Sequence, residues 1–263
     1  MPDVDTYPAG VPCWVETLQP DLAAAMRFYA GVFGWTMRAD DEERPTYVVA
    51  TLRGREVAGI ASAAEVGADD AVGWFTQVRV DDLDAALSQA VAAGATDVVG
   101  PVDASPAGHL AILTDPVGAR LGLWEATARE GAEVVNEPNA WAMSALQTPD
   151  PARSRAFYGE VFGWGADAMG PADLFRLPGY VGGTEHQPVP RDTVAVGFPA
   201  TDSAAVGWHV DFWSDDVVGL AGRVGDLGGR VLSGPDEENG FLRVVVSDPA
   251  GATFSVSQLQ RSP

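Results

Sequence analysis

The sequence contains no lysine, so its 16 basic residues are all arginine, and 37 acidic residues outnumber them. The formal net charge of −21 makes nucleic acid and anionic membrane surfaces unfavourable partners. A single cysteine, Cys13, excludes an internal disulfide and a cysteine-rich zinc site. No segment approaches the roughly 18 apolar residues of a membrane span, and no basic N-terminal region precedes an apolar run. We therefore expect a cytoplasmic protein with no nucleic-acid and no membrane partner.

What is present fits a globular chain. At 263 residues, with 46% hydrophobic and 20% charged residues, the chain can build two packed domains of ordinary size. A charged, aperiodic stretch at 126–140 is the best boundary between them. The sequence predicts domains at 11–126 and 139–259.

One stretch occurs twice. DLAAAMRFYAGVFGW at 21–35 returns as DPARSRAFYGEVFGW at 150–164, with Asp, Phe-Tyr, Val-Phe and Gly-Trp at the same spacing. Apolar residues three or four apart predict an amphipathic helix that ends at Gly34 in the first copy and Gly163 in the second. Asp21 and Asp150 are expected in the first turn, after prolines at the first helical position. A repeat of this length indicates a duplicated domain.

Alternating strand patterns surround these helices. Strands are expected at 13–18, 35–38, 46–52 and 56–63, then at 74–80, 96–99, 110–114 and 120–125, with a second helix from Asp81-Asp82 through Ala93. Each half of the chain thus reads as two βαβββ units, which is an α+β fold. The second half departs at Pro178–Arg191, a Gly- and Pro-rich segment that is either a lid over a cavity or an idle surface loop.

Four βαβββ units, with FYxxVFGW in the odd ones and a DPxGA turn in the even ones, resemble the vicinal oxygen chelate superfamily. That superfamily includes glyoxalase I, extradiol dioxygenases, fosfomycin-resistance enzymes and bleomycin-binding proteins. The chain is similar, more narrowly, to actinobacterial two-domain glyoxalase-like proteins, which carry a run like Leu177 to Asp192. The resemblance covers about residues 11 to 259. It implies tandem glyoxalase-like domains, each a curved, mostly antiparallel sheet trough with helices outside and ligand inside.

The resemblance also implies where metal ligands would stand. Metal enzymes of the superfamily place His or Glu at three strand positions per domain, and five of the six positions here hold residues that do not usually ligate a divalent cation. The six residues are Trp14, Phe75, Gly122, Met143, His209 and Ser255. We therefore expect no metal and no cofactor. Fused four-unit relatives can pair the first unit with the fourth, which would bring Trp14 and Glu16 to His209.

Strand alternation predicts which side chains face the trough. Residues two apart share a face, so Glu16 lies with Trp14, Gln77 with Phe75, and Asp211 and Trp213 with His209. The mixture of aromatic and polar groups is typical of a small-molecule pocket. The candidate ligand-binding residues are Trp14, Glu16, Phe75, Gln77, Trp124, Met143, His209, Asp211, Trp213 and Ser255.

Single residues leave alternatives open. His209 and Asp211 are candidate catalytic residues, with His209 as a general base, or His209 is a hydrogen-bonded lining residue. Trp14, Phe75 and Trp124 either stack on a planar ligand or pack between sheets. Trp35 and Trp164 are interpreted as structural, and His109 and His186 have no partner spacing that predicts a role.

Three functions remain open. The preferred one is a non-metal binding protein, a monomer or homodimer, that holds an aromatic or amphipathic molecule such as a natural product or toxic metabolite. The alternative is a glyoxalase-like lyase or related enzyme, with or without a metal at His209. A third is a protein-interaction module with vestigial troughs. Apolar trough walls and the overall acidity favour neutral or cationic aromatic ligands over polyanions.

Overall fold

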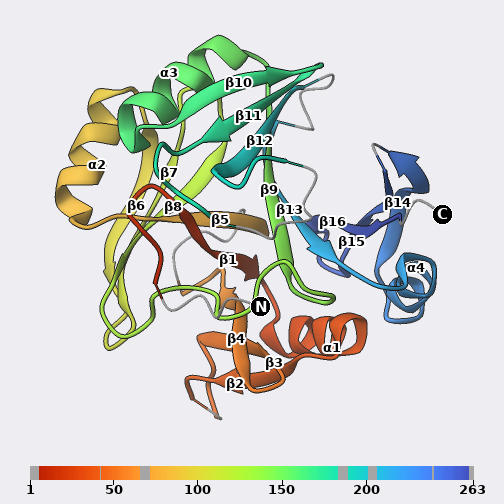
Figure 1. The fold of residues 1–263 in the computed structure, drawn as a ribbon. Coiled ribbons are helices and arrows are strands. Elements are labelled where there is room, and N and C mark those ends of the chain that lie inside the picture. Colours follow the sequence, from red (N-terminus) through yellow and green to blue (C-terminus); the bar gives the residue numbers. More distant parts are fainter. Residues whose placement is uncertain are drawn as a thin grey trace. The chain divides into compact units, whose positions relative to one another are not determined.

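The structure is a computed structural model that describes residues 6–41, 43–65, 72–182, 189–200, 206–238 and 240–260. The described chain forms sixteen strands and four helices, arranged as four successive βαβββ quarters (Figure 1). The first quarter comprises β1 (Pro12–Gln19), α1 (Leu22–Phe33), β2 (Thr36–Ala39), β3 (Tyr47–Leu52) and β4 (Arg55–Ser62). The second comprises β5 (Gly73–Arg79), α2 (Leu83–Ala92), β6 (Thr96–Asp103), β7 (Gly108–Thr114) and β8 (Arg120–Ala126).

The second half of the chain repeats this order. The third quarter comprises β9 (Trp141–Thr148), α3 (Pro151–Phe162), β10 (Gly165–Met169), β11 (Ala172–Arg176) and β12 (Thr193–Pro199). The fourth comprises β13 (Gly207–Trp213), α4 (Val217–Asp226), β14 (Arg230–Glu238), β15 (Phe241–Ser247) and β16 (Thr253–Leu259). The predicted α+β fold of duplicated βαβββ units is confirmed.

Helices α1 and α3 begin later than the sequence predicted, directly after Asp21 and Asp150. The side chain of Asp21 accepts a hydrogen bond from the Ala24 N–H, and Asp150 accepts one from Arg153, so both are N-caps and not first-turn residues. The prediction placed them after a first-position proline, and the local hydrogen bond to a free backbone N–H decides otherwise. Gly34 ends α1 in the left-handed region, with φ of 71°, which a residue with a side chain rarely adopts.

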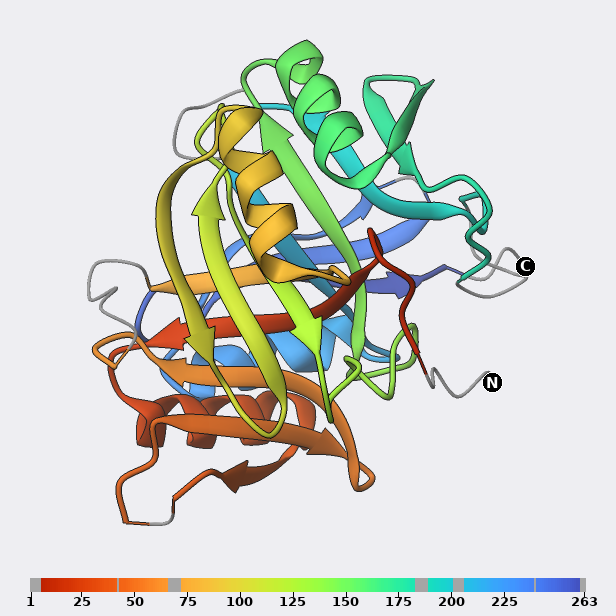
Figure 2. The ribbon, with the colours of Figure 1, turned by 90° about the vertical axis from the view of Figure 1, so that its left-hand side faces the viewer.

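The strands form two eight-stranded sheets, in the orders β2-β3-β4-β1-β5-β8-β7-β6 and β10-β11-β12-β9-β13-β16-β15-β14. The sheets are mixed. β1 runs parallel to β4, with Glu16 opposite Gly59, and β13 runs parallel to β16, whereas the outer pairs are antiparallel. Figure 2 shows α2 lying against one face of β6, β7 and β8. We call the opposite face of each sheet, turned away from its helices, the trough face.

The chain divides into two compact units that do not coincide with its two halves. Unit 1 consists of Met1–Trp14, Phe75–Gly131 and Met143–Trp208, and unit 2 consists of Val15–Trp74, Ala132–Ala142 and His209–Pro263. Unit 1 therefore holds most of the second and third quarters, and unit 2 most of the first and fourth. The resemblance to the vicinal oxygen chelate superfamily allowed this pairing of the first βαβββ quarter with the fourth.

Each unit has an aromatic core under its repeated helix. In unit 2, Tyr29 is fully buried, and Phe33 of α1 stacks on Trp35 with ring centroids 4.6 Å apart. In unit 1, Tyr158 stacks on Trp164 at 5.3 Å. Trp35 and Trp164 are 3% and 4% exposed, in agreement with their structural interpretation. The repeated FYxxVFGW motif thus supplies aromatic residues of the interface between helix and sheet.

The stretch predicted as a connector is part of the packed structure. Ala132, Val134 and Ala140 are buried, and the Glu133 N–H donates to the Glu56 carbonyl oxygen at 2.8 Å. The Asn139 carbonyl oxygen accepts from the indole of Trp35 at 2.7 Å. Its charged composition suggested a solvated linker, but small apolar residues between the charges allow residues 132–140 to pack as part of unit 2.

Two other expectations need adjustment. β6 extends to Asp103 and not to Val99, because register shifts at Val99 and Val102 let it stay paired with β7. Of the candidate lid at 178–191, residues 183–188, including His186, lie outside the described residues. Its two ends are joined by backbone hydrogen bonds, Leu177 to Asp192 and Gly182 to Arg191. A lid role stays a prediction.

Candidate functional site

The ten predicted ligand-binding residues divide between the two units. Unit 1 contains Trp14, Phe75, Gln77, Trp124 and Met143, and unit 2 contains Glu16, His209, Asp211, Trp213 and Ser255. Trp14 and Glu16, two residues apart on β1, fall on either side of the division. Each group is considered within its own unit.

Packing contacts fix the faces of the strands in unit 2. The ring of Phe212 in β13 packs against Phe33 of α1, with ring centroids 4.8 Å apart. The ring of Phe254 in β16 packs against Phe28 of α1, with centroids 6.4 Å apart. Because side chains alternate along a strand, Asp211 and Ser255 lie on the opposite, trough face. The alternation predicted from sequence is confirmed for these strands.

Asp211 is the centre of a buried polar cluster on that trough face. Its Oδ1 accepts hydrogen bonds from the hydroxyls of Ser255 at 2.5 Å and Ser257 at 2.9 Å. Arg243 of β15 donates from Nη2 to Ser255 Oγ at 3.0 Å, and its Nε lies 3.8 Å from Asp211 Oδ1. Asp211, Ser255 and Ser257 are 9%, 3% and 5% exposed. The Asp211 carboxylate is thus held in place by two serine hydroxyls and lies close to the Arg243 guanidinium.

The neighbours of this cluster differ in accessibility. His209 and Trp213 are half-buried, and so is Arg243, which leaves them within reach of a small molecule. Glu16, at 3% exposed, is buried beside Gly59 of β4. Unit 2 therefore has half-buried imidazole, indole and guanidinium groups on the same strand faces as the buried Asp211 cluster.

The trough face of unit 1 is closed by comparison. Trp14, Phe75 and Trp124 are at most 4% exposed. At Gly122, a Cβ would stand 2.7 Å from Gln77 Cγ and 3.3 Å from Phe75 Cε2, so those side chains already fill the space above this strand position. The packing interpretation of these aromatic residues therefore fits unit 1 better than stacking on a ligand.

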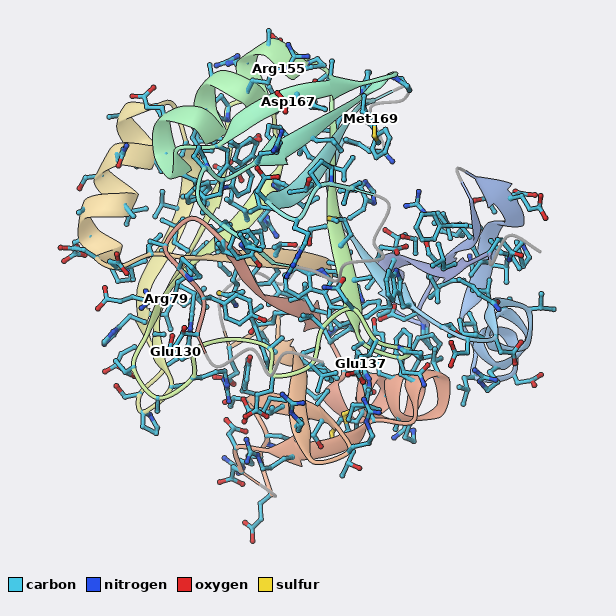
Figure 3. All side chains as sticks on the ribbon, in the orientation of Figure 1. Arg79, Glu130, Glu137, Arg155, Asp167 and Met169 are labelled. Atoms are coloured by element: carbon cyan, nitrogen blue, oxygen red, sulfur yellow. The ribbon has the colours of Figure 1, made fainter. Side chains whose placement is uncertain are left out.

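The segment after β8 covers part of this aromatic wall. The Trp124 indole donates to the Arg129 carbonyl oxygen at 2.9 Å, and the Arg129 guanidinium carbon lies 5.2 Å from the Trp14 ring centroid. Arg79 of β5 lies 3.9 Å from Glu130 (Figure 3). Met143 packs elsewhere, against an apolar cluster of Ala172, Leu174 and Val196 with Val189 and Phe198.

Sequence reasoning missed Arg243 of the unit 2 site, whereas strand alternation already predicted Ser257 on the trough face. Arg243 of β15 alternates with the buried Val244 and shares its face with Phe241 and Val245, which was a usable signal for the trough face. Ser257 follows Ser255 by two residues and shares its face. Trp141 lies directly after the predicted connector, and it opens β9, which begins two residues earlier than the strand predicted from Met143.

The superfamily's metal chemistry was tested against these donors. Among the described residues, no three His, Cys, Asp or Glu side chains lie close enough together to hold a metal ion. Of the six family positions, Gly122 is filled by its neighbours, and Ser255 donates its hydroxyl to Asp211. Zinc and similar transition metals usually take three or four imidazole, thiolate or carboxylate ligands, and His209 is the one residue of that kind among the six.

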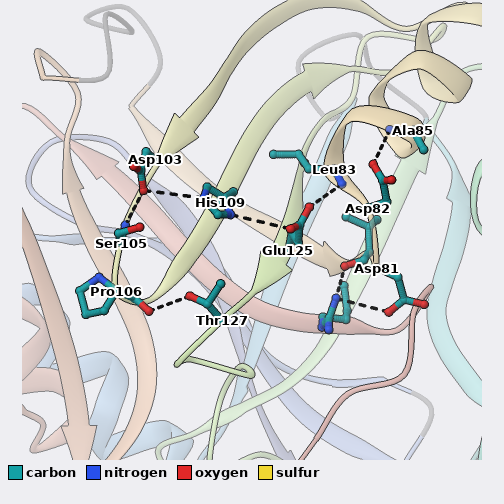
Figure 4. A network of polar contacts seen from close by, with 12 residues as sticks. Asp81, Asp82, Leu83, Ala85, Asp103, Ser105, Pro106, His109, Glu125 and Thr127 are labelled. Atoms are coloured by element: carbon teal, nitrogen blue, oxygen red, sulfur yellow. Dashed lines mark hydrogen bonds and ion pairs between the residues drawn. The ribbon is translucent and has the colours of Figure 1, made fainter.

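His109 has partners that the sequence did not predict. It lies on β7 between two carboxylates, with Nε2 3.8 Å from Asp103 on β6 and Nδ1 3.8 Å from Glu125 on β8 (Figure 4). Glu125 also accepts from the Leu83 N–H at the start of α2, at 2.7 Å. His109 shares a strand face with Glu125, which bonds the start of α2, so His109 lies on the helix side of the sheet and not on the trough face.

A second buried carboxylate system recurs in both units at the DPxGA turns. Asp248 Oδ2 accepts from the Tyr29 hydroxyl at 2.8 Å, and Asp115 Oδ2 accepts from Tyr158 at 2.6 Å. Burial raises the pKa of Asp115, against hydrogen bonds from Tyr158 and backbone N–H groups that lower it. Burial likewise raises the pKa of Tyr29 and Tyr158 well above the usual value. Each Tyr–Asp pair lies on the helix side of its sheet and joins the DPxGA turn to the repeated helix.

Comparison with known proteins identifies the family. The model described as Glyoxalase/Bleomycin resistance protein/Dioxygenase superfamily matches residues 14–139, and Glyoxalase-like domain matches residues 143–257. The chain is 35% identical over 269 residues to "Putative glyoxylase CFP32" of Mycobacterium bovis, covering 97% of each chain. It belongs to the glyoxalase/bleomycin resistance protein/dioxygenase superfamily.

Other proteins are similar to this one over nearly the whole chain. Anthracycline biosynthesis protein DnrV of Streptomyces peucetius is 29% identical, covering 97% of this chain and 95% of that one. The 2,3-dioxygenase LapB of Pseudomonas sp. KL28 is 15% identical with a TM-score of 0.64, covering 97% and 94%. The Mn(II)-bound glyoxalase of Novosphingobium aromaticivorans is 17% identical with the same score, covering 95% and 82%. The two structures show the shared fold alone.

One finding bears on membranes. None of the helices in the described part of the chain has the length and apolar character needed to cross a bilayer. The longest described helices have 12 residues, well short of the roughly 20 needed to span.

Proposed function

We propose that this chain is a small-molecule-binding protein that holds an aromatic or amphipathic ligand on the trough face of unit 2, without the metal ion of its superfamily. The observation that carries the proposal is the polar cluster on the trough face of unit 2. Half-buried His209, Trp213 and Arg243 lie beside buried Asp211 and the two serines bonded to it. A flat apolar surface beside a few fixed polar groups is what small-molecule sites offer.

The names of relatives support an aromatic ligand. A 29% identical relative is named an anthracycline biosynthesis protein, and anthracyclines are polycyclic aromatic compounds. Trp213 supplies indole surface on which such a ring system can stack. The closed trough face of unit 1, with Phe75 and Gln77 over Gly122, favours unit 2 as the site.

Ligand-binding variants test this assignment. We expect planar aromatic compounds to quench tryptophan fluorescence saturably, and Trp213→Leu to weaken that binding about tenfold, because stacking with an aromatic ring contributes about 0.5–1.5 kcal/mol beyond its buried area. Met143→Leu in unit 1 is the matched control and should bind as the parent does. Equal weakening by both variants, or by Met143→Leu alone, would remove the assignment to unit 2.

Metal analysis tests the other half of the proposal. Protein purified without an affinity tag or chelator should contain less than one transition metal per chain by elemental analysis. A stoichiometric metal that disappears in His209→Ala would overturn the metal-free site.

A second candidate function is a glyoxalase-like or related enzyme, because a 35% identical relative carries the name glyoxylase and His209 shares the trough face with Asp211. Asp211 is poorly placed as a proton acceptor, since its Oδ1 already accepts from two hydroxyls. Turnover of methylglyoxal with a thiol that is lost in His209→Ala would favour the enzyme. No turnover in the parent would favour the binding protein.

A further inference from the structure

The trough face of unit 1 is apolar across three neighbouring strands. Trp124 of β8 pairs with Leu110 of β7, and Leu110 pairs with Val102 of β6. In the next row, Gly122 pairs with Ile112. Leu110, Ile112 and Trp124 are at most 7% exposed. Apolar side chains that are this deeply buried contribute to packing and offer a ligand few polar contacts.

The equivalent row of unit 2 is polar. Ser257 of β16 pairs with Arg243 of β15, and Arg243 pairs with Asp236 of β14. Trp213 of β13 pairs with Ser257 and completes the row. Asp236 directly follows a Gly-Pro pair, as Val102 does in unit 1, so the two rows occupy the same place in the duplicated fold. We call Trp213, Ser257, Arg243 and Asp236 the polar row. The two units therefore share a strand arrangement but differ in chemistry at these positions.

The polar row can be reached at both ends. Trp213 is half-buried at one end, and Asp236 is exposed at the other, on the outermost strand of the sheet (Figure 1). Between them, the Arg243 side chain is 28% exposed and Ser257 is 5% exposed. Neighbouring strands lie about 4.8 Å apart, so the two ends of the row are about 14 Å from each other. A molecule of this length can contact the indole and the two charged groups at once.

The charges of the polar row do not select an ion of either sign. Arg243 has a carboxylate on either side, because it pairs with Asp236 and its Nε lies 3.8 Å from Asp211 Oδ1. A bound anion would meet Asp236, and a bound cation would meet Arg243. A neutral hydroxyl can donate to the carboxylate and accept from the guanidinium. The row therefore suits a molecule with several neighbouring hydroxyls.

We propose that unit 2 recognises an aromatic compound that carries a sugar ring, through the hydroxyls of that sugar. The inference rests on the proposed function and names the polar part of its amphipathic ligand. Trp213 packs on the aromatic ring, while the sugar hydroxyls accept from Arg243 and donate to Asp236. Unit 1 carries Leu110 and Val102 at the two equivalent positions, and neither side chain forms hydrogen bonds. Sugar recognition therefore distinguishes unit 2 from unit 1.

Three probes that share a naphthalene ring test which polar group the site prefers. They are 2-naphthyl β-D-glucoside, 2-methoxynaphthalene, which keeps the aryl ether without the hydroxyls, and 2-naphthylmethylammonium, which carries a cation. Equilibrium dialysis at about 0.15 M salt measures their dissociation constants while long-range charge effects are screened. We expect the full-length protein to bind the glucoside about tenfold more tightly than either of the others, because its hydroxyls gain charged partners.

Two neighbouring variants on β14 test the polar row itself. Asp236→Ala removes the exposed carboxylate of the row and should weaken the glucoside about tenfold, as expected for one lost hydrogen bond to a charged group. Glu237→Ala is the matched control, because Glu237 is exposed, pairs with Leu242 and lies on the opposite face of β14. It changes the net charge equally and should bind the glucoside as the parent does. Both side chains are exposed, so both variants should melt as the parent does.

The outcomes separate the two proposals. Equal binding of the glucoside and 2-methoxynaphthalene, or a glucoside affinity that Asp236→Ala leaves unchanged, would overturn sugar recognition and leave the binding function standing. Tighter binding of the ammonium would show that the carboxylates select a cation, and would also overturn it. An equal loss of affinity in Asp236→Ala and Glu237→Ala would assign the effect to overall charge, with the same consequence. Binding of none of the three probes would count against the proposed function itself.

Discussion

Removing the hydroxyl of Tyr158 should destabilise unit 1 strongly, because that hydroxyl joins two buried groups. It donates to Asp115 Oδ2 at 2.6 Å and accepts from the Trp208 indole at 2.9 Å. Tyr158 is fully buried, and Asp115 is 2% exposed. Tyr158→Phe keeps the ring packing and deletes only these bonds.

The magnitude follows from what each partner loses. A hydrogen bond to a charged group contributes about 1.5–3 kcal/mol, and a buried donor left unsatisfied costs about 1–3 kcal/mol. The expected loss is about 3–5 kcal/mol, a large share of a domain's stability. Tyr29→Phe in unit 2 is the matched comparison. Asp248 Oδ2 there keeps a bond from Gln19 Nε2 at 2.7 Å, so that variant should lose about 1 kcal/mol less.

The loss should also depend on pH. Burial raises the pKa of Asp115 and the Tyr158 hydroxyl lowers it, so removing the hydroxyl raises the folded-state pKa further. A raised carboxyl pKa means that stability is lost as pH rises through it. The difference between parent and variant should therefore grow from about pH 4 to pH 7.

Urea unfolding at several pH values measures this difference, with far-UV circular dichroism and tryptophan fluorescence as independent probes. The reasoning would be refuted by a Tyr158→Phe variant that matches the parent in midpoint and slope. A penalty that is largest at acid pH would refute the assignment of the effect to Asp115.

Other predictions concern packing, ionisation and chain division. Gly122→Ala should lower the free energy of unfolding by about 1–3 kcal/mol, because its Cβ would lie 2.7 Å from Gln77 Cγ. Gly222→Ala in α4, where the Cβ would meet open space, should raise it by up to about 1 kcal/mol. The urea midpoints of the two variants, compared with the parent, test both expectations. Burial raises the pKa of both Tyr29 and Tyr158, so the unfolded chain ionises first and the free energy of unfolding should fall above about pH 10; a flat profile there would contradict the burial. Separate fragments 1–131 and 132–263 should not fold alone, because each unit takes residues from both; a sharp, cooperative melt of either fragment would be the contrary result.

Local patterns were sufficient to predict the fold. The repeated helix, its glycine stop and the alternating strands depend on neighbours in sequence, and all four βαβββ quarters occur as expected. The faces of β13 and β16 were predictable for the same reason, as the bonds of Ser255 and Ser257 to Asp211 show. Periodicity determines which side of a strand a residue takes.

Partners far apart in sequence could not be predicted in the same way. Asp248 was interpreted as a turn residue, and its bond to Tyr29 joins residues 219 positions apart. Arg243 was overlooked because an arginine on a strand usually indicates a solvated position, whereas here it is half-buried and donates to Ser255 of β16. The packing of Ala132 and Val134 was not predicted, because the acidic residues around them indicated a linker.

The composition of the two units also sets an order of events during synthesis. Unit 1 has all of its segments once residue 208 has been made, whereas unit 2 needs Val15–Trp74 to wait for His209–Pro263. Closing so long a loop is slow, and the first quarter emerges with its apolar side chains exposed. A nascent chain should therefore acquire protease resistance in unit 1 first. The N-terminal quarter, although made earliest, is completed last, and it is where misfolding and the need for chaperones will concentrate.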